Sequence, residues 1–417
     1  MNRFFAGDLS EVQKCIETLD DLCLDGKARS KVCKLLFLLI IGEQYGHHTL
    51  RSILDSLGVS SNNYQKIWQK ISCQTIIRVA NAYFSFVLSS RLQALGEKSI
   101  STHSRANITL IIDGSVFKQW LENELFGKYY AKYFSGQTHR CEYGFHLILL
   151  GISIGEDFYP FRFHILRKDK GQTAKSVACK LLQKAHSFLA NLASCHSISW
   201  GKLYLSVDSG FRCPKLLEYC EQFDIAPIVA CTKSHNYIID GQKAKLSKHI
   251  EQLYKKKEEE HKKQYSDNQK EAPAFVLRVK AYYSCMKKWV ILVFFRVNHS
   301  KKVSVVFTTY LLAQAKTVRR RFFQRVKIEQ FFRFVKHTLK IQQSTSKNFI
   351  GFLKKVALFF LKAVLCLAFQ KKYRKMRGAN KKWGFERIRR YIMHNVEKTP
   401  LEKLVFSKTF CTDLAFE

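Results

Sequence analysis

Acidic residues are scarce in this sequence. The 417 residues include 33 Asp and Glu against 70 Lys and Arg, which gives a formal net charge of +37. A protein with this charge is expected to bind a polyanion, and nucleic acid is favoured over an anionic membrane surface. Because 47% of the residues are hydrophobic and 13% are aromatic, the chain has enough apolar material for two or three folded domains, and disorder is not expected.

Paired cysteines and an N-terminal apolar core are also missing. None of the 13 cysteines forms a CxxC pair and their spacings match no zinc-binding pattern, so reduced thiols in a cytosolic compartment are expected. Residues 1–21 contain acids and no continuous apolar run, so secretion is not expected. Segment 349–369 has the length of a membrane span but contains Lys354, Lys355 and Lys362. A helix packed on the core, with lysines that reach DNA or solvent, is favoured over a span.

Hydrophobic periodicity predicts helices within residues 1–104, followed by a change to strands. A short turn separates two of the predicted strands, which indicates a hairpin. The expected order is three strands, a helix, a strand, a helix and a strand. The predicted strands are 107–113, 142–155, 158–167, 203–208 and 225–231, and the predicted helices between them are 173–193 and 214–223.

Three further segments follow this alternating region. Residues 254–273 mix charges of both signs, for which a solvated loop or helix edge is favoured over a direct role. Residues 274–309 are again rich in strand-forming residues. The segment 319–340 is helical by its period and contains neither Gly nor Pro, and its only acid is Glu329. A solvated helix face would normally mix Glu and Asp with its Lys and Arg.

Two aspartates occupy similar places in the predicted strands. Asp113 closes "ITLIID" and Asp208 closes "LYLSVD". If these strands are parallel neighbours, the two carboxylates lie about 5 Å apart, and a divalent cation would relieve their repulsion. The alternative for each aspartate taken singly is a turn or helix-cap residue. The pair together with Glu329 favours a metal site.

Four residues of the basic helix share one face at helical spacing, namely Phe322, Arg325, Glu329 and Lys336. An intrahelical salt bridge of Glu329 is the plain interpretation, worth about 0.3 to 0.5 kcal/mol. A nuclease, however, needs cations for phosphates and a carboxylate for metal beside the scissile bond. The stretch Phe322-x2-Arg325-x3-Glu329-x6-Lys336 resembles the Tyr-Arg-Glu-Lys signature of the DDE transposases in the insertion-sequence-four family, with Phe in place of Tyr.

Further blocks resemble those of the same family. They are "LIIDGS" around Asp113, "VDSGF" around Asp208, and "VSVVFTT" before the signature helix. The resemblance covers roughly residues 105–345 and implies an α/β, RNase H-like fold, with a mixed sheet flanked by helices. The expected domains are a helical N-terminal domain for DNA ends (1–104), the first part of the catalytic core (105–234), a β-rich insertion subdomain (235–308), the signature helix (309–345) and a basic helical C-terminal region (346–417).

The resemblance also implies an activity. It is that of a transposase, which cuts DNA at the ends of its insertion sequence and joins them to target DNA by cut and paste. Asp113, Asp208 and Glu329 would bind two Mg²⁺ ions, with Mn²⁺ as a substitute, which activate a water or 3′-hydroxyl and stabilise the leaving oxygen. The implied partners are double-stranded DNA and a second copy of the chain in the DNA complex. Neither a membrane nor a small-molecule substrate is expected, and the location is cytoplasmic, at the nucleoid when DNA is bound.

Contacts to DNA are implied for several residues. Arg325, Arg333 and Lys336 would contact phosphates, and Phe322 lacks the hydroxyl that a Tyr would supply there. Trp289 lies in the insertion, where some relatives stack a Trp on a flipped base, and packing in the core is its alternative.

The C-terminal segment 371–390 is predicted to contact DNA as well. It holds ten Lys and Arg with one acid and interleaved aromatic residues, and a solvated tail is its alternative. The basic residues singled out are Lys371, Lys372, Arg374 and Lys375. Three other functions stay open: a degenerate transposase that only binds DNA, an RNase H-like nuclease without strand transfer, and a membrane protein that rests on 349–369 alone.

Overall fold

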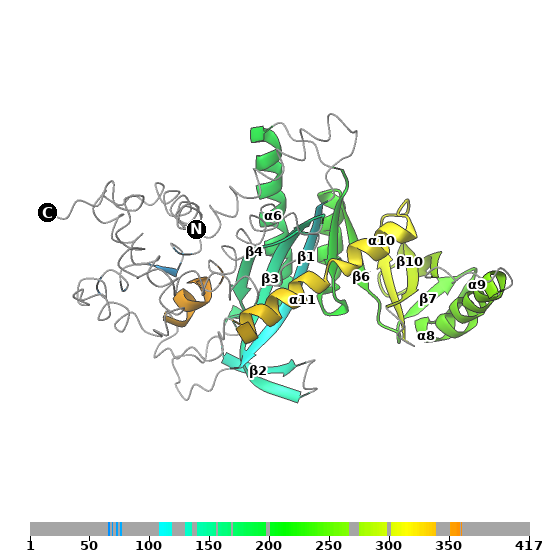
Figure 1. Ribbon diagram of the computed structural model, residues 1–417, viewed down its shortest axis with the longest axis horizontal. Helices are drawn as coiled ribbons and strands as arrows, with labels where there is room; N and C mark the ends of the chain where they lie inside the picture. The colour runs from blue at the N-terminus through cyan, green and yellow to red at the C-terminus, as the bar shows by residue number, and fades with distance from the viewer. Residues whose placement is uncertain are drawn as a thin grey trace, which may run out of the picture. The chain divides into compact units, whose positions relative to one another are not determined.

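The described part of the chain falls into two compact units. One unit comprises residues 92–122 and 127–332, and the other comprises 1–91, 123–126 and 333–417. The computed structural model (Figure 1) describes only some residues of each unit. Almost all of the predicted domain 1–104 lies outside the described residues. The described residues are 108–118, 130–135, 140–155, 157–167, 170–196, 201–266, 275–297, 302–338, 351–358 and 360, with single positions between 66 and 76.

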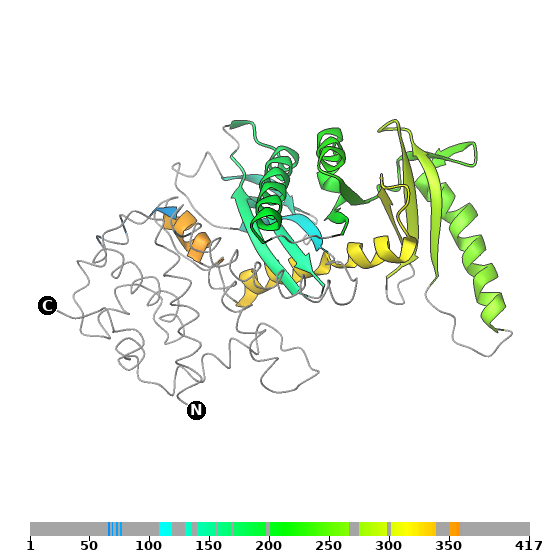
Figure 2. The same ribbon diagram turned by 90° about the horizontal axis from the view of Figure 1, so that it is seen from above.

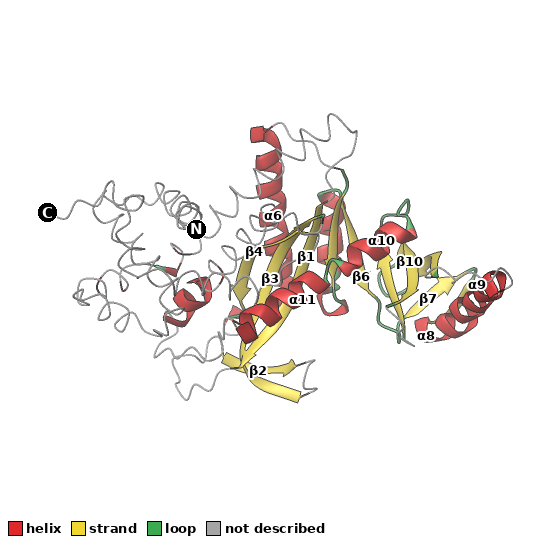
Figure 3. Cartoon of the chain, in the orientation of Figure 1, coloured by secondary structure: helices red, strands yellow, loops and turns green. Residues whose placement is uncertain are grey.

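A mixed β-sheet forms the centre of the larger unit (Figure 3). Its middle strand β1 runs antiparallel to β3 and parallel to β5, and β5 runs parallel to β6. Strands β2 and β4 both pair antiparallel with β3. The strands are β1 (Ile108–Lys118), β2 (Tyr130–Ser135), β3 (Arg140–Ile154), β4 (Asp157–Ile165), β5 (Leu203–Val207) and β6 (Ile225–Ala230).

Five more strands continue this sheet beyond β6. Strand β11 pairs antiparallel with β6, and β10, β9, β7 and β8 follow in that spatial order. The strands expected in the insertion 235–308 therefore extend the sheet of the core. Their bounds are β7 (Asn236–Ile239), β8 (Gln242–Lys245), β9 (Val276–Tyr283), β10 (Lys288–Arg296) and β11 (Val303–Thr308).

Helices cover both faces of the sheet. Helices α6 (Ala174–His196) and α7 (Pro214–Gln222) lie on one face, and α10 (Ala315–Phe323) and α11 (Val326–Arg333) lie on the other (Figure 2). The sheet buries apolar side chains on both faces, since all five residues of β5 are buried. A strand covered on both sides reads as a continuous apolar run, which is why "LYLSV" could be recognised from sequence.

Apolar contacts fix α10 and α11 on their face of the sheet. Val318 of α10 is fully buried in a cluster with Tyr204, Ile228 and Phe295. Because this cluster draws on β5, β6 and β10, the extended sheet and α10 share one core.

Aromatic rings fix α11 on the same face. The ring of Phe331 in α11 lies 5.9 Å from the ring of Phe158 in β4. The ring of Phe332, also in α11, lies 6.3 Å from the ring of Phe117 in β1. Burying an aromatic side chain of this size contributes roughly 1.5–3 kcal/mol.

A charged helix lies beside the extended part of the sheet. Helix α8 (Leu246–His249) passes through the π-helix η6 (Ile250–Lys255) into α9 (Lys256–Ser266). The solvated interpretation of this segment is wrong for Glu258, which is only 6% exposed. Its oxygens lie 2.6 and 2.7 Å from Nε and Nη2 of Arg296 on β10. These hydrogen bonds lower the Glu258 pKa and attach the helix to the sheet.

The predicted order of strands and helices agrees with the structure. The hairpin of β3 and β4 is confirmed, and α6, β5, α7 and β6 follow in the expected order. Strand β2 is an addition that the sequence did not predict. The spatial order β4-β3-β1-β5-β6, with β1 at its centre, is a mixed α/β arrangement consistent with the RNase H-like expectation.

The smaller unit is described only in part. Residues 351–358 are helical there, and Lys354 is 5% exposed. Its Nζ donates a hydrogen bond of 3.1 Å to the Gln69 carbonyl oxygen, and burial lowers its pKa. The expectation that Lys354 reaches DNA or solvent is therefore wrong. Among the helices of the described residues, none has the length and apolarity to cross a membrane.

Candidate active site

Asp113 lies in the middle of the sheet. Parallel pairing between β1 and β5 runs as far as Ile112 opposite Val207, so Asp113 and Asp208 follow side by side, as the sequence predicted. The expectation that the strand ends at Asp113 is wrong, because β1 continues to Lys118 in its pairing with β3. Asp113 is half-buried.

The residue after Asp113 is a glycine for a steric reason. A Cβ on Gly114 would lie 2.6 Å from His146 Nε2 and 2.9 Å from the Ile148 side chain. Its backbone N–H donates to Asp113 Oδ1 at 2.8 Å, which holds the carboxylate. Gly114 therefore leaves room over β1 for the side chains of His146 and Ile148 from β3.

Asp208 lies where β5 ends. It caps the short 3-10 helix η5 (Ser209–Phe211), and its Oδ1 accepts a hydrogen bond of 2.7 Å from the Ser209 N–H. The helix-cap interpretation is therefore confirmed for Asp208. Its side chain is still 47% exposed, which leaves the carboxylate able to bind a further group.

The segment that carries Glu329 is not one continuous helix. Helix α10 ends at Phe323 and α11 begins at Val326, so the prediction of an unbroken helix through 319–340 is wrong. At the junction the N–H groups of Gln324 and Arg325 bond to carbonyls three residues back, at 3.1 and 3.0 Å. Three-residue bonds tighten the backbone turn, and such a stretch within a helix often marks a functional position.

Two arginines, one helical turn apart near this junction, contact residues of the sheet and of its strand ends. Arg321 is 3% exposed, and its Nη1 donates to Thr109 Oγ1 at 3.3 Å. Its guanidinium lies 5.2 Å from the centre of the Tyr204 ring. Thr109 and Tyr204 are partners across β1 and β5, and four residues further along both strands stand the two aspartates. Arg325, four residues after Arg321, reaches those aspartates.

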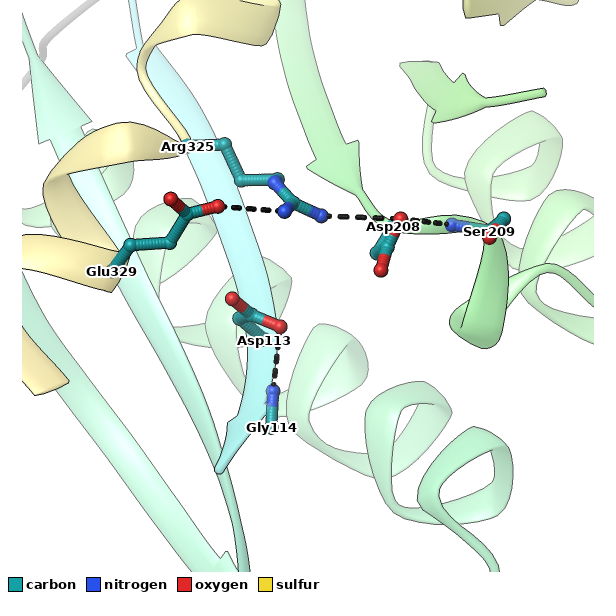
Figure 4. A network of polar contacts seen from close by, with 6 residues as sticks. All are labelled: Asp113, Gly114, Asp208, Ser209, Arg325 and Glu329. Carbon is teal, nitrogen blue, oxygen red and sulfur yellow. Dashed lines mark hydrogen bonds and ion pairs between the residues drawn. The ribbon is translucent and has the colours of Figure 1, made fainter. Parts of the chain in front are cut away.

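Arg325 lies among the three carboxylates (Figure 4). Its Nη2 donates to Glu329 Oε1 at 2.6 Å, and its Nη1 lies 3.3 Å from Asp208 Oδ1 as an ion pair. The salt bridge predicted between Glu329 and the residue one turn before it is confirmed, but it joins α11 to the junction, and Arg325 also links it to Asp208 after β5. Phe322 lies under the guanidinium, 5.9 Å from it, and packs on the α10 core.

The electrostatics of the site follow from this geometry. The pKa of Asp113 is raised to about 6, mainly by burial. Arg325 and the Gly114 N–H act to lower it, and the charges of Glu329 and Asp208 act with burial to raise it. Burial disfavours the Arg325 charge, but the three carboxylates outweigh it and raise the Arg325 pKa. Asp113 therefore interacts electrostatically with Arg325 and with both of the other carboxylates.

Divalent metal ions fit the chemistry of this donor set. Three carboxylates are hard oxygen ligands, which Mg²⁺ and Mn²⁺ prefer. In the arrangement described here, the guanidinium of Arg325 supplies the positive charge between Asp208 and Glu329. Among the described residues, no three His, Cys, Asp or Glu side chains are grouped closely enough to hold one ion. Joint coordination would therefore require Arg325 to release at least one carboxylate.

The structure describes some of the other predicted site residues. Trp289 of β10 is 53% exposed, so its packed-core interpretation is wrong. Arg333, the last residue of α11, is exposed. Lys336 lies in the π-helix η7 (Phe334–Thr338), which belongs to the smaller unit. The basic residues of 371–390, with Lys371, Lys372, Arg374 and Lys375 among them, lie outside the described residues.

Sequence reasoning missed several residues around the site. Arg321 and Lys327 are basic residues in a basic segment, and nothing in the sequence separates them from their neighbours. Ser153, which contacts the junction of α10 and α11 at 2.8 Å through Gln324, is 171 residues away in sequence. The Gly directly after Asp113 was the one available signal, since a glycine within a strand pattern often marks close approach.

Fold and site together define a class of protein, an α/β domain with carboxylates on adjacent parallel strands and on a late helix. Residues 161–365 match the sequence model of the family described as Transposase DDE domain. This match supports a DDE transposase. The matched stretch includes Asp208, Arg325 and Glu329, and Asp113 precedes it. No curated protein matches the chain.

Proposed function

We propose that this protein is a transposase of the insertion-sequence-four branch, which cleaves DNA at the ends of its element and transfers the ends to target DNA by cut and paste. The observation that carries the proposal is the position of Arg325 among Asp113, Asp208 and Glu329, in a chain whose residues 161–365 match the transposase DDE domain. Carboxylates brought together from β1, β5 and α11 suit phosphoryl-transfer chemistry better than a structural role.

Asp113, Asp208 and Glu329 would hold two Mg²⁺ or Mn²⁺ ions. When bound, such ions lower the pKa of a water or 3′-hydroxyl and stabilise the charge on the leaving oxygen. Asp113, which its Gly114 hydrogen bond orients, must be ionised to serve as a ligand. Arg325, once released from Asp208 or Glu329, is placed to bind a phosphate oxygen beside the scissile bond. Phe322 supports the guanidinium by its ring.

Trp289 is proposed to stack on an unpaired base. Its ring lies edge-on to Tyr282 at 5.5 Å, and Lys280 Nζ lies 4.9 Å from its centre. An exposed aromatic ring beside a cation is typical of single-strand contact surfaces. Phosphates would lie near Arg333 and Lys336, and along the basic segment 371–390.

Two copies of the chain are proposed to act together in the cytoplasm, because transposition has to hold two DNA ends. The net charge of +37 opposes association of two free copies, so the proposed pairing is expected on DNA, which neutralises that charge. Light scattering of the protein with and without DNA of the element ends would test this. A monomer in the DNA complex would contradict it.

The test of the function is cleavage of a plasmid that carries the gene with its native flanks. Wild type, Asp113→Asn and Asp240→Asn are incubated with Mg²⁺, Mn²⁺ or EDTA. Asp240 is a matched control, because it is exposed at a β-turn with φ 48°, where Asn is well tolerated. Cuts at the element boundaries are expected for wild type and Asp240→Asn, but neither with EDTA nor with Asp113→Asn.

Other outcomes distinguish the remaining functions. A wild-type protein that binds the flanks without cutting them in either metal would indicate a degenerate transposase that only binds DNA. Cutting without joining to a target plasmid would indicate an RNase H-like nuclease that lacks strand transfer. The Phe322→Tyr variant would then show whether the missing hydroxyl limits activity.

A further inference from the structure

A buried hydroxyl connects the junction of α10 and α11 to the β3–β4 hairpin. Ser153, near the end of β3, is 1% exposed. Its Oγ lies 2.8 Å from Gln324 Oε1 and 3.1 Å from the Asp157 carbonyl oxygen, and it accepts a hydrogen bond of 2.9 Å from Lys327 Nζ. Lys327 also donates to the Gly155 carbonyl oxygen at 2.9 Å. These contacts hold one short stretch of helix against one turn.

Ser153 and Lys327 each take part in more than one of these hydrogen bonds. The Ser153 hydroxyl has one proton, which it donates either to Gln324 or to Asp157, and it accepts from Lys327. Lys327 brings a positive charge to a carbonyl at the hairpin turn, where Gly155 has φ 56°. Hydrogen bonds from a charged donor are stronger than those between neutral groups. The arrangement therefore resists movement of the junction along the hairpin.

Arg325 lies between the two residues that Ser153 holds. Gln324 precedes it, Lys327 follows it by two, and Glu329 lies one helical turn after it. Asp113 lies in β1 and Asp208 directly follows β5, whereas Arg325 lies at the junction and Glu329 lies in α11. The distance between these two halves of the site thus depends on how the junction is attached to the sheet.

We infer that Ser153 and Lys327 are positioning residues, which set the place of Arg325 and Glu329 against Asp113 and Asp208 by clamping the α10–α11 junction to the β3–β4 hairpin. The inference rests on the proposed function for its catalytic consequence. Its structural part, the clamp, concerns the chain alone. A nucleophilic Ser–Lys pair is a different use of the same groups, but a hydroxyl that is 1% exposed offers no access to a substrate.

The test uses Ser153→Ala, Lys327→Met, their double variant and Lys327→Arg. Outer groups that orient metal ligands typically contribute 10- to 100-fold to affinity or activity. Each single variant is therefore expected to weaken Mn²⁺ binding, measured by calorimetry without DNA, about 10-fold. Turnover of DNA ends should fall about 10-fold at an unchanged KM, and Lys327→Arg should retain most of both.

The double variant separates the clamp from two independent losses. Since Ser153 and Lys327 contact each other and serve the same attachment of the junction to the hairpin, the double variant is expected to lose no more than the worse single variant. Losses that multiply would overturn the inference, and so would wild-type Mn²⁺ affinity and turnover in both single variants. Lys316→Met is the control, since Lys316 is an exposed lysine of α10.

Hydrogen exchange distinguishes failure of the clamp from failure of the proposed function. Amides of residues 324–329 should exchange faster in Ser153→Ala and Lys327→Met than in wild type and Lys316→Met, whether or not the protein cuts DNA or binds Mn²⁺. A wild-type protein without cleavage would refute the function and leave this readout intact. Unchanged exchange in both variants would refute the clamp itself.

Discussion

Asp113 carries a cost in folding stability, which its raised pKa shows. Its pKa of about 6 lies above the ordinary value of 3.8 because the carboxylate is buried. At 1.36 kcal/mol for each pKa unit, the ionised form is disfavoured by about 3 kcal/mol. Ligands of a divalent ion must be deprotonated, so metal binding would recover part of this cost. The metal-free protein should therefore be less stable at neutral pH than its packing allows.

Asp113→Asn should stabilise the metal-free protein at pH 7. The folded-state pKa is raised, so the contribution of Asp113 is most favourable below about pH 4 and is lost as the pH rises through about 6. The variant has no such loss, and its unfolding free energy at pH 7 should exceed that of wild type by up to about 3 kcal/mol. Thermal unfolding in EDTA from pH 4 to 7 measures this, and a difference that does not grow with pH would contradict it.

Arg325→Gln should make the stability of the protein depend more strongly on added Mn²⁺. The substitution removes the charge that Asp208 and Glu329 share and that lowers the Asp113 pKa. The pKa of Asp113 should rise above about 6, and stability at pH 7 should fall by about 1–3 kcal/mol.

The measurement for Arg325→Gln is thermal unfolding with EDTA and with Mn²⁺. Mn²⁺ should raise the Tm of Arg325→Gln by more than it raises that of wild type. Arg320→Gln is the control, because Arg320 is an exposed residue of α10. An equal rise in all three proteins would show that Arg325 does not compete with metal.

Trp289→Ala should impair processing of DNA ends several-fold and leave duplex affinity unchanged. Stacking of a base on an aromatic side chain contributes about 1–3 kcal/mol, and Trp289→Phe should keep most of it. Tyr143→Ala is the control, because Tyr143 on β3 is also a largely exposed aromatic residue, at 57%. Cleavage and end products on gels report the outcome, and equal processing by Trp289→Ala and wild type would refute stacking.

At this scale the sequence indicated the chemistry but not every contact. Asp113, Asp208 and Glu329 could be found because acids are rare near apolar strand ends and in a basic helix. The link between Arg325 and Asp208 could not, since it depends on how helix and sheet are placed. The exposure of Trp289 was equally hidden, because Trp289 begins the apolar run of "KKWVILVFF" and its burial depends on which strands and helices cover the ring.

At the scale of elements, the packing of β3 side chains over β1 depends on one glycine. Gly114→Ala should destabilise the fold by about 1–3 kcal/mol, because its Cβ would meet His146 and Ile148 within 3 Å. Gly210→Ala, two residues after Asp208, is the matched control, because nothing lies within 4 Å of a Cβ there. Denaturant unfolding compares the two variants, and an equal loss of stability would contradict the steric argument.

The elements also show where sequence patterns suffice and where they fail. Strands β3 to β6 were predicted within a few residues, because apolar runs bounded by turn residues depend on local composition. The break between α10 and α11 was not, because 319–340 contains neither Gly nor Pro. Tertiary contacts accompany the break, among them those of Ser153 with Gln324 and Lys327. Periodicity cannot register a partner 171 residues away.

At the scale of the whole molecule, charge should govern DNA affinity. Each phosphate contact contributes about 0.9 to the slope of log affinity against log salt for duplex DNA. Replacement of Lys371, Lys372, Arg374 and Lys375 by Gln should lower affinity for all sequences and reduce that slope by up to about 3.6. Fluorescence anisotropy from 50 to 200 mM salt measures it, and an unaltered slope would indicate a solvated tail.

The site residues come from distant parts of the sequence, and this has a consequence for the nascent chain during translation. A ribosome delivers the chain from its N-terminus, and Asp113 and Asp208 emerge well before Glu329. A polypeptide released before Arg325 would carry two carboxylates, with neither the third nor Arg325. If the proposed function holds, interrupted translation yields fragments that occupy DNA without cutting it. Incomplete synthesis would then restrain the element instead of endangering its host.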